Sequence, residues 1–428
     1  MTDNSDIAAR KAALQLLDGV LRKHRSVDDA FDAQTARLEA RDRAFARLLV
    51  ATMLRRFGQI DAVLKVFVTK KPADPVMDIL RLGAAQLLFL GTPPHAAVAT
   101  SVALAKQGYA PAAGFVNAVL RRVSEKGASL VAAQDAARLV TPDRLWKSWE
   151  EAYGPAVARA IAEAHLKEPP LDLSLKDPAA AAQWAADLGA VALPTGSLRL
   201  TDAGRVQDLK GFAEGAWWVQ DAAAALPAKI LAHILSKPSQ VIDLCAAPGG
   251  KTAQLAAAGH TVTAVDVSGA RLGLLRDNLA RLNLQAQVLE ADALTWRPAA
   301  PADAVLLDAP CTATGTIRRH PDLPLMKTAL DPVGAAAAQA QLIRAAAAMV
   351  RLGGYVFYSV CSLQPEERRA VVTSVLAAEP SLAAIALPKD IVGDPHLIDS
   401  AGDLNTLPAH WPERGGLDGF YGTLLQKR

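Results

Sequence analysis

The sequence predicts an α plus α/β multidomain protein, with an N-terminal all-helical bundle, a small mixed α/β middle subdomain and a C-terminal doubly wound, Rossmann-like sheet. The chain has 428 residues, 51% of them hydrophobic, which is enough for two or three domain cores. Apolar residues recur at helical spacing in the first third of the chain. Beyond residue 236 they form short runs separated by segments of helix length. We therefore expect domains at 1–135, 141–235 and 236–428.

The first domain is predicted to be helical throughout. Between Ile7 and Leu21 the apolar side chains of Ile7, Leu14, Leu17 and Leu21 form one stripe, and charged residues lie outside it. Similar patterns recur at 41–67, 74–90 and 112–126, with Gly and Pro residues between them. These patterns favour a bundle of amphipathic helices.

The middle subdomain gives weaker signals. The stretch 143–154, "DRLWKSWEEAYG", is typical of a helix, and "EPPLDLSLKD" at 168–177 indicates an extended segment after two prolines. The stretch 215–235 indicates a strand followed by a helix. A small mixed α/β unit fits this order.

The C-terminal part alternates strands with helices. Short apolar runs occur at 240–244, 261–266, 285–290, 303–308 and 353–360. This alternation is typical of a parallel sheet with helices on both faces. In such sheets ligands bind beyond the carboxyl ends of the strands, so reactive residues are expected there.

Composition limits the class of protein. Residues 1–130 carry 19 Lys and Arg against 12 Asp and Glu, a net +7, whereas the rest carries 27 against 31, a net −4. This excess of positive charge suits binding to a polyanion such as RNA, or equally a solvated basic helical face.

Three cysteines are too few for a disulfide framework, and no C-x-x-C pair suggests zinc, so we expect no metal. The most apolar early stretch contains Arg81 and is too short to span a bilayer, which favours a cytoplasmic protein without membrane contact.

The stretch "VIDLCAAPGGKT" at 241–252 allows two interpretations. It ends like a phosphate-binding loop, but Cys245 stands where that loop needs its first Gly, and Pro248 lies inside it. Asp308, after four apolar residues, could still be the magnesium-binding Asp of a nucleotidase. A P-loop nucleotidase therefore stays open as one alternative.

The other interpretation is a nucleoside-binding site. Gly249 and Gly250 let backbone amides and the following helix N-terminus approach a ligand closely. Asp266, 23 residues after Asp243, ends the next strand and is well placed to bind ribose hydroxyls. Asp292 follows the third strand, where an adenine would lie. Each acid alone could simply cap a turn, but three at successive strand ends favour a site.

Two cysteines suggest the chemistry. Cys311 and Cys361 are predicted at strand ends that face the same crevice, although a buried Cys is usually an inert hydrophobe. A thiolate can add to C6 of a pyrimidine and make C5 nucleophilic enough to take a methyl group from a sulfonium donor. Asp308 could hold a cytosine through N3 and its amino group.

At this point the motifs show a family resemblance. "DLCAAPGGKT", "AVDVS", "DAPCTATGTIRRHPD", "YSVCSLQPEE" and "LDGFYGTLL" resemble the motif series of the RNA 5-methylcytosine methyltransferases of the Nol1/Nop2/Sun family over roughly 215–428. The N-terminal region, with "DRAFARLLVATMLRR" and "GFVNAVLRRV", is similar to NusB-like RNA-binding domains. That combination resembles the bacterial members that methylate cytosine C5 in small-subunit (16S) ribosomal RNA.

The resemblance implies roles for individual residues. S-adenosyl-L-methionine would be the cofactor, with Asp266 at its ribose and Asp292 at its adenine. Cys361 would be the nucleophile, Cys311 would assist product release and Asp308 would bind the base; the DNA enzymes instead use the Pro-Cys thiol. Cys245 has no family role. The loop that cradles the cofactor would comprise Ala246, Ala247, Pro248, Gly249, Gly250 and Lys251, with Asp308 also near the cofactor.

The resemblance also concerns RNA. Arg318, Arg319 and His320 in "TIRRHPD" are expected to contact RNA phosphates, and His320 has no partner at metal-ligand spacing. The target should be single-stranded or pre-assembly ribosomal RNA, because a duplex hides C6. Val360 replaces a common Thr, and "LDLSLKD" replaces Leu-Arg-Val-Asn, so Lys176 is a candidate substitute contact. We expect a monomer. Transfer RNA as substrate and a non-catalytic RNA-binding or assembly factor remain alternatives.

Overall fold

The computed structural model describes residues 4–326 and 331–428. The chain divides into two compact units, each of which draws on two separate stretches of sequence. The helical unit comprises Met1–Glu168 and Ile317–Leu330, and the sheet unit comprises Pro169–Thr316 and Asp331–Arg428. The fold class predicted from the sequence is confirmed, since a helical region precedes a Rossmann-like sheet. The three predicted domain boundaries stay predictions.

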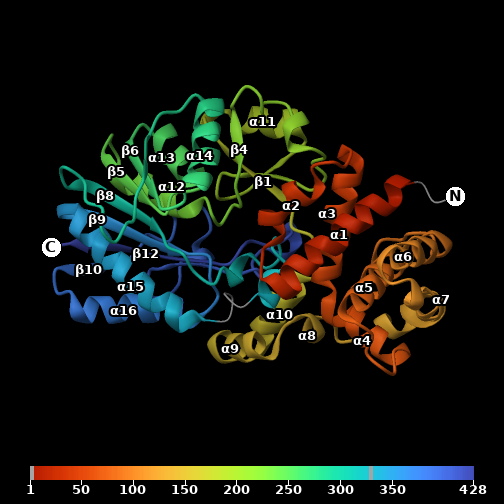
Figure 1. Ribbon diagram of the computed structural model, residues 1–428. Helices are drawn as coiled ribbons and strands as arrows, with labels where there is room; N and C mark the ends of the chain where they lie inside the picture. Colours follow the sequence, from red (N-terminus) through yellow and green to blue (C-terminus); the bar gives the residue numbers. More distant parts are fainter. Residues whose placement is uncertain (1–3, 327–330) are drawn as a thin grey trace. The chain divides into compact units, whose positions relative to one another are not determined.

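The helical unit is built as its apolar periodicity predicts. Leu17 of the predicted stripe is fully buried, and Ile7 and Leu14 pack against the same core. The pattern at 41–67 forms two helices instead of one, because the backbone leaves helical geometry at Arg56, where φ is −107° and ψ is 13°. The helices are α1 (Asn4–Lys23), α2 (Val27–Thr35), α3 (Ala40–Arg55), α4 (Phe57–Phe67), α5 (Asp74–Phe89), α6 (Pro94–Gly108), α7 (Ala113–Ala132), α8 (Ala136–Val140), α9 (Asp143–Tyr153) and α10 (Pro155–His165) (Figure 1).

The sheet unit begins with a small antiparallel sheet of order β2-β3-β1-β4. A buried ion pair joins two of its strands, since Arg199 Nε donates to Asp172 Oδ1 over 2.6 Å. The extended segment and the strand-then-helix predicted here are confirmed. The elements are β1 (Leu171–Leu175), α11 (Ala181–Leu188), β2 (Val191–Ala192), β3 (Leu198–Leu200), β4 (Trp217–Val219) and α12 (Leu226–Leu235).

The main sheet has eight strands in the order β10-β12-β9-β8-β5-β6-β7, with β11 paired to β12. Strands β5 to β9 are parallel where they pair, as the apolar runs predict. They are β5 (Gln240–Leu244), β6 (Thr261–Asp266), β7 (Gln287–Glu290), β8 (Ala302–Asp308) and β9 (Val350–Val360). The remaining strands are β10 (Leu382–Ile385), β11 (Leu404–Thr406) and β12 (Phe420–Lys427).

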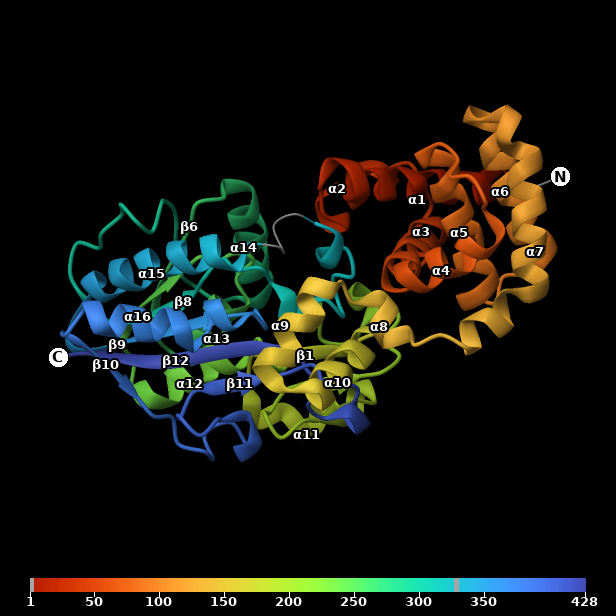
Figure 2. The same cartoon turned by 90° about the horizontal axis from the view of Figure 1, so that it is seen from below.

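Helices cover both faces of this sheet (Figures 1 and 2). Along β8, Val305 and Leu307 join the core that contains Ile343, whereas Leu306 joins the core that contains Ile230 on the other face. Both faces of β8 are therefore buried, which explains why its sequence is a continuous apolar run. Besides α12, the helices are α13 (Gly250–Ala257), α14 (Gly269–Leu282), α15 (Pro332–Met349) and α16 (Arg369–Ala378).

The C-terminal edge departs from the predicted parallel pattern. Strand β12 runs antiparallel to β9, β10 and β11. The stretch between β11 and β12 holds only a 3₁₀ turn at Pro412–Arg414, and antiparallel neighbours need no helical crossover. The sheet is therefore mixed. Within the described residues, no helix is both long and apolar enough to cross a bilayer.

Candidate active site

The carboxyl ends of β5, β6 and β8 bring three carboxylates around one cysteine. Cys245 follows β5 directly and has a left-handed backbone, with φ at 59°. Burial, and then the charges of Asp308, Asp266 and Asp243, raise the pKa of its thiol to about 12. Cys245 therefore stays protonated and packs against the main core. Asp243 and Asp266, two of the acids that the sequence places at successive strand ends, thus lie near Cys245 together with Asp308.

The loop after β5 is held by the end of β6. The backbone N–H of Ala247 donates to Asp266 Oδ2 over 3.1 Å, and Ser268 N–H donates to Asp266 Oδ1 over 2.9 Å. Arg271 donates to the Ala247 carbonyl. The carboxylate predicted to bind a ribose thus also fixes the loop predicted to bind the cofactor.

Glycine is required at Gly249. Its φ is 102°, and a Cβ added there would lie 2.6 Å from Cγ of Leu275. Ala246 and Ala247 before it are buried, while Pro248, which follows a cis peptide bond, is exposed. The loop therefore turns sharply into α13, whose first N–H groups lack partners within the helix.

Asp243 is fully buried beneath this loop. Its Oδ2 accepts from the Thr252 hydroxyl over 2.6 Å, whereas Oδ1 has no hydrogen-bond partner in the described structure. Burial raises the pKa of Asp243 to about 7. An orphaned buried oxygen of this kind marks a place where a bound group can supply a hydrogen bond.

Asp292 lies apart from this cluster. Strand β7 ends at Glu290, so Asp292 stands two residues beyond it, and its side chain is exposed. Its Oδ1 accepts from the N–H of Leu294 over 2.9 Å, which is the turn-capping arrangement weighed from the sequence. An adenine contact at Asp292 stays a prediction.

The two cysteines predicted to face one crevice are adjacent. Sγ of Cys311 lies 3.4 Å from Sγ of Cys361, although 50 residues separate them in the chain. The hydrogen bond with Cys361, followed by burial and by the negative charge of Glu367, raises the pKa of the Cys311 thiol well above its usual range. Cys311 is therefore suited to hold a proton beside its neighbour.

A buried polar network behind the cysteines escaped the sequence reasoning. Glu367 is fully buried, and its carboxylate accepts from Thr312 N–H over 2.9 Å and from the Ser362 hydroxyl over 2.6 Å. Gln339 donates to the same carboxylate over 3.0 Å and in turn accepts from the Tyr358 hydroxyl over 2.9 Å. The "LQPEE" string after Cys361 was the only signal in the sequence that could have pointed to it.

The predicted RNA-contact residues lie in the helical unit. Arg318 is 1% exposed, and its carbonyl accepts from Arg55 over 3.0 Å, so its guanidinium lies in the interior. Beside it the pKa of His165 falls to about 3, through burial and then the charges of Arg318 and Arg55.

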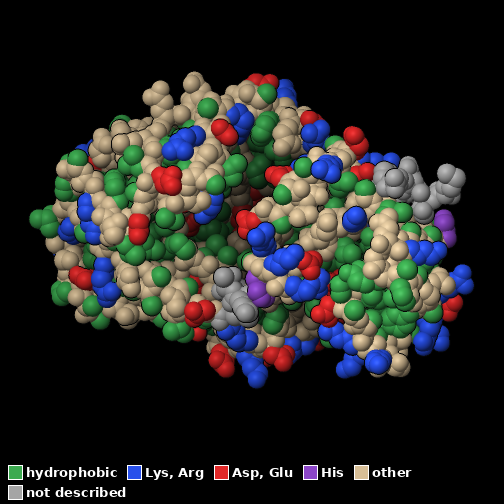
Figure 3. Space-filling model, in the orientation of Figure 1, with side chains coloured by type: hydrophobic (Ala, Val, Ile, Leu, Met, Phe, Trp, Pro, Cys, Tyr) green, Lys and Arg blue, Asp and Glu red, His purple; other side chains and the backbone are tan. Residues whose placement is uncertain are grey.

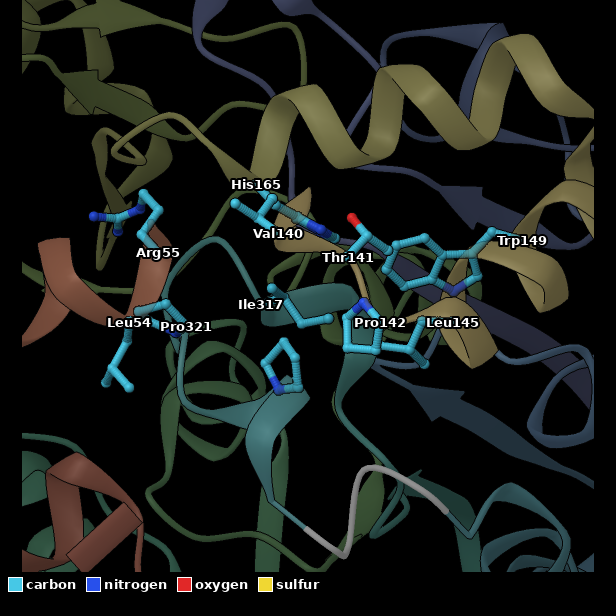
Figure 4. Close-up of a pocket in the computed structure, with 11 residues that line it drawn as sticks. Leu54, Arg55, Val140, Thr141, Pro142, Leu145, Trp149, His165, Ile317 and Pro321 are labelled. Carbon is cyan, nitrogen blue, oxygen red and sulfur yellow. The ribbon is translucent and has the colours of Figure 1, made fainter. Parts of the chain in front are cut away.

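Figure 4 shows the adjoining cavity, which is lined by residues of α3 and of the α8–α9 region and by Ile317 and Pro321. It has about 20 Å³, room for about one water.

Arg319 and His320 are half-buried. Nδ1 of His320 lies 3.1 Å from Asp28 Oδ2, and Asp322 Oδ2 accepts from the N–H of Val27 over 2.9 Å. These contacts tie the segment that begins at Ile317 to the start of α2. On the face of the helical unit in Figure 3, Lys and Arg side chains lie among acidic ones. No cluster of three metal-ligating side chains occurs within 4–326 and 331–428.

Comparison with known proteins gives two family matches. Residues 232–426 match the family described as 16S rRNA methyltransferase RsmB/F, and residues 7–125 match the NusB family. "Ribosomal RNA small subunit methyltransferase B" of Pseudomonas putida is 34% identical to this chain, with 98% of each chain covered. The protein of the same name from Sodalis glossinidius is 36% identical, with 88% of this chain and 90% of that one covered.

Solved structures share the fold. PH0851 superposes with a TM-score of 0.75 at 22% identity and covers all of both chains. NSun6 from Pyrococcus horikoshii with SFG has a TM-score of 0.54 at 19% identity, over 67% of this chain and 98% of that one. Both matches agree with the Rossmann-like fold of the sheet unit.

Proposed function

We propose, for a chain that belongs to the 16S rRNA methyltransferase RsmB/F family, that it methylates C5 of a cytosine in small-subunit ribosomal RNA through a covalent bond between Cys361 and C6. Family membership rests on relatives that are at least 34% identical over 88% or more of the chain. The observation that carries the cytosine chemistry is the pair of thiols, Cys311 and Cys361, 3.4 Å apart at the carboxyl end of the sheet.

The loop between β5 and α13 fits S-adenosyl-L-methionine. The unpaired N–H groups of α13 suit its carboxylate, and Gly249 leaves room for close approach. Asp266 and Asp308 provide negative charge that suits its sulfonium. The bound cofactor would supply the methyl group. Ala246 to Lys251 would cradle it, with Asp266 at the ribose and Asp292 at the adenine.

The two cysteines have different proposed roles. The Cys361 thiolate would add to C6 of the cytosine and make C5 nucleophilic enough to take the methyl group of the cofactor. As the bond to C5 forms, the S–CH3 bond of the sulfonium would break and leave its electron pair on the neutral thioether product. A base then takes the C5 proton, the Cys361–C6 bond breaks and the double bond returns. The high pKa of Cys311 supports a role in which this thiol donates or accepts a proton during release.

Asp308 is suited to bind the cytosine base. Its Oδ1 accepts from Ser359 and its Oδ2 from Lys251, so the carboxylate is oriented from both sides. We propose that its carboxylate accepts from the amino group of cytosine and from N3 in the N3-protonated form of the ring, whose positive charge favours attack at C6. The opposite assignment, Lys251 as the phosphate-binding lysine of a nucleotidase, is disfavoured because Asp308 already holds its ammonium at 2.7 Å.

The RNA partner follows from the NusB match and the basic N-terminal region. We propose that residues 1–130, together with Arg319 and His320, contact RNA phosphates, and that the protein acts as a cytoplasmic monomer on single-stranded or pre-assembly RNA. Arg318 contributes to packing instead. Binding should weaken as salt rises, because each phosphate contact releases counterions.

Bisulfite sequencing of RNA from cells with and without the gene tests the proposal. We expect one protected cytosine of small-subunit ribosomal RNA to lose its protection, and a plasmid that encodes Cys361→Ala to leave it unprotected. A lost transfer-RNA signal with unchanged ribosomal RNA would keep the chemistry and overturn the substrate. No change in any RNA would favour a non-catalytic assembly factor.

A further inference from the structure

Cys311 and Cys361 lie on two separate loops, and the distance between their thiols depends on how these loops are held together. Thr312 directly follows Cys311 and Ser362 directly follows Cys361, and the Glu367 carboxylate accepts from both of these residues. Oε1 takes the two hydroxyls, and Oε2 takes the N–H of Thr312 and the amide of Gln339. Four donors fill the four lone-pair sites of one ionised carboxylate.

We propose that Glu367 is a positioning residue of the methyl transfer: its buried carboxylate ties the Cys311 loop to the Cys361 loop and thereby sets the separation of the two thiols. The inference rests on the proposed function, because it concerns how the same cysteines are presented to the base. No smaller or neutral side chain can accept from all four donors at once, since an amide would place its own N–H groups against them.

The same carboxylate acts on the Cys311 thiol. The Glu367 charge contributes to the raised pKa of Cys311, after the hydrogen bond with Cys361 and burial. A carboxylate held beside this loop disfavours a thiolate at Cys311. The contact that sets the spacing therefore also helps to keep the Cys311 thiol protonated.

Other contacts hold the loops when Glu367 is changed. Gly315 N–H donates to the carbonyl of Cys361 over 2.9 Å, and Leu363 N–H donates to the Thr314 hydroxyl over 2.9 Å. These bonds do not involve Glu367. We therefore expect substitution of Glu367 to loosen the thiol pair and leave the overall fold intact.

Glu367→Gln tests the proposal, with Glu366→Gln as its matched control. At saturating RNA and cofactor, we expect kcat of Glu367→Gln to fall about 10- to 100-fold, with an unchanged KM for S-adenosylmethionine, because misplacement by an ångström costs rate and not cofactor affinity. Glu366→Gln should keep its rate. An unchanged kcat, or equal losses in kcat and cofactor affinity, would overturn the positioning role.

A second readout does not depend on methyl transfer. Hydrogen peroxide oxidises one thiol to a sulfenic acid with release of one water, and a neighbouring thiol closes this to a disulfide with release of a second water. The alternative is further oxidation to a sulfinic acid, so the ratio of disulfide to sulfinic acid at a fixed peroxide concentration reports how often the sulfurs meet. We expect this ratio to be at least about tenfold lower in Glu367→Gln than in Glu366→Gln. Equal ratios would overturn the inference even if the protein methylates no RNA, so its failure is separable from failure of the proposed function. If Glu367→Gln does not fold, Ser362→Ala removes one of the same hydrogen bonds and should lower the ratio less.

Discussion

The ammonium of Lys251, in the first turn of α13, lies 2.7 Å from Oδ2 of Asp308 at the end of β8. The other oxygen of Asp308 accepts from Ser359, two residues before Cys361 on β9, over 3.1 Å. The Lys251 ammonium also lies over the ring of Phe420, 5.2 Å from its centroid. One carboxylate therefore links the predicted cofactor loop to the two strands that carry the cysteines.

Asp308→Asn should separate base recognition from cofactor binding. The substitution keeps the shape of the side chain and removes the negative charge proposed to pair with the N3-protonated cytosine, so we expect single-turnover methyl transfer to fall about 10²- to 10³-fold. Calorimetry should show a much smaller change in the Kd of S-adenosylmethionine. Ser359→Ala removes one contact to Asp308 and should reduce the rate of methyl transfer less than Asp308→Asn does. Equal losses of rate and affinity in Asp308→Asn would place Asp308 mainly in the cofactor site.

Cys311→Ala should accumulate a covalent RNA adduct. If Cys311 assists release, Cys361 still attacks C6 in this variant but departs slowly. A slowly migrating protein–RNA band on a denaturing gel should appear with Cys311→Ala and be absent with Cys361→Ala or with both changes together. If the band appeared with Cys361→Ala and not with Cys311→Ala, the two cysteines would have the opposite roles.

Peroxide should inactivate the enzyme reversibly. The sulfurs stand 3.4 Å apart and need to approach to about 2.05 Å to form a disulfide, which would remove the proposed nucleophile, Cys361. Methyl transfer should return after dithiothreitol, and mass spectrometry of unreduced peptides should find Cys311 linked to Cys361. Cys245→Ser should be inactivated equally; protection by this change would show that Cys245 takes part.

Gly249→Ala should weaken cofactor binding and stability together. The new Cβ would meet Leu275 at 2.6 Å in a backbone with φ of 102°. Gly259→Ala is the matched control, because Gly259 also has a positive φ, 86°, but nothing lies within 4 Å of an added Cβ. We expect the control to lose about 1 kcal/mol of stability and Gly249→Ala to lose more. Thermal unfolding with and without S-adenosylmethionine measures both effects; indistinguishable variants would contradict the close approach.

Stability of the free protein should fall as pH rises towards neutrality. The pKa of Asp243 is about 7 in the fold against 3.8 in the unfolded chain, so between these values the native state holds a proton that the unfolded state releases. Each pH increase in this window therefore favours unfolding. Asp243→Asn, which can still accept from Thr252, should flatten the dependence of the urea midpoint between pH 4.5 and 7.5. An unchanged slope would contradict a protonated Asp243.

Much of the fold and part of the site could be predicted because they depend on local patterns. The strand-end positions of Asp266 and Asp308 follow from short apolar runs with turn residues after them. The adjacency of Cys311 and Cys361 follows from the meeting of parallel strand ends. Each of these predictions needs only the strand and its neighbour.

Other features depend on tertiary packing that no local pattern encodes. Arg318 looks in the sequence like an exposed basic loop residue, yet it is buried beside His165 of α10. Glu367 has no role assigned from the sequence, yet it binds loops that are about 50 residues apart in the chain. The break at Arg56 interrupts a continuous apolar pattern. In each case partners distant in sequence decide the structure.

The interleaving of the two units sets the order in which the protein can be completed during synthesis. The helical unit takes in a segment that starts at Ile317, about 150 residues after Glu168, and the chain rejoins the sheet unit at Asp331. At typical synthesis rates its last piece follows about 10 to 30 s after the helices. The bundle therefore leaves the ribosome with its Ile317 and Pro321 contacts unmade, and a gene cut after residue 168 would encode a helical fragment with an apolar face uncovered.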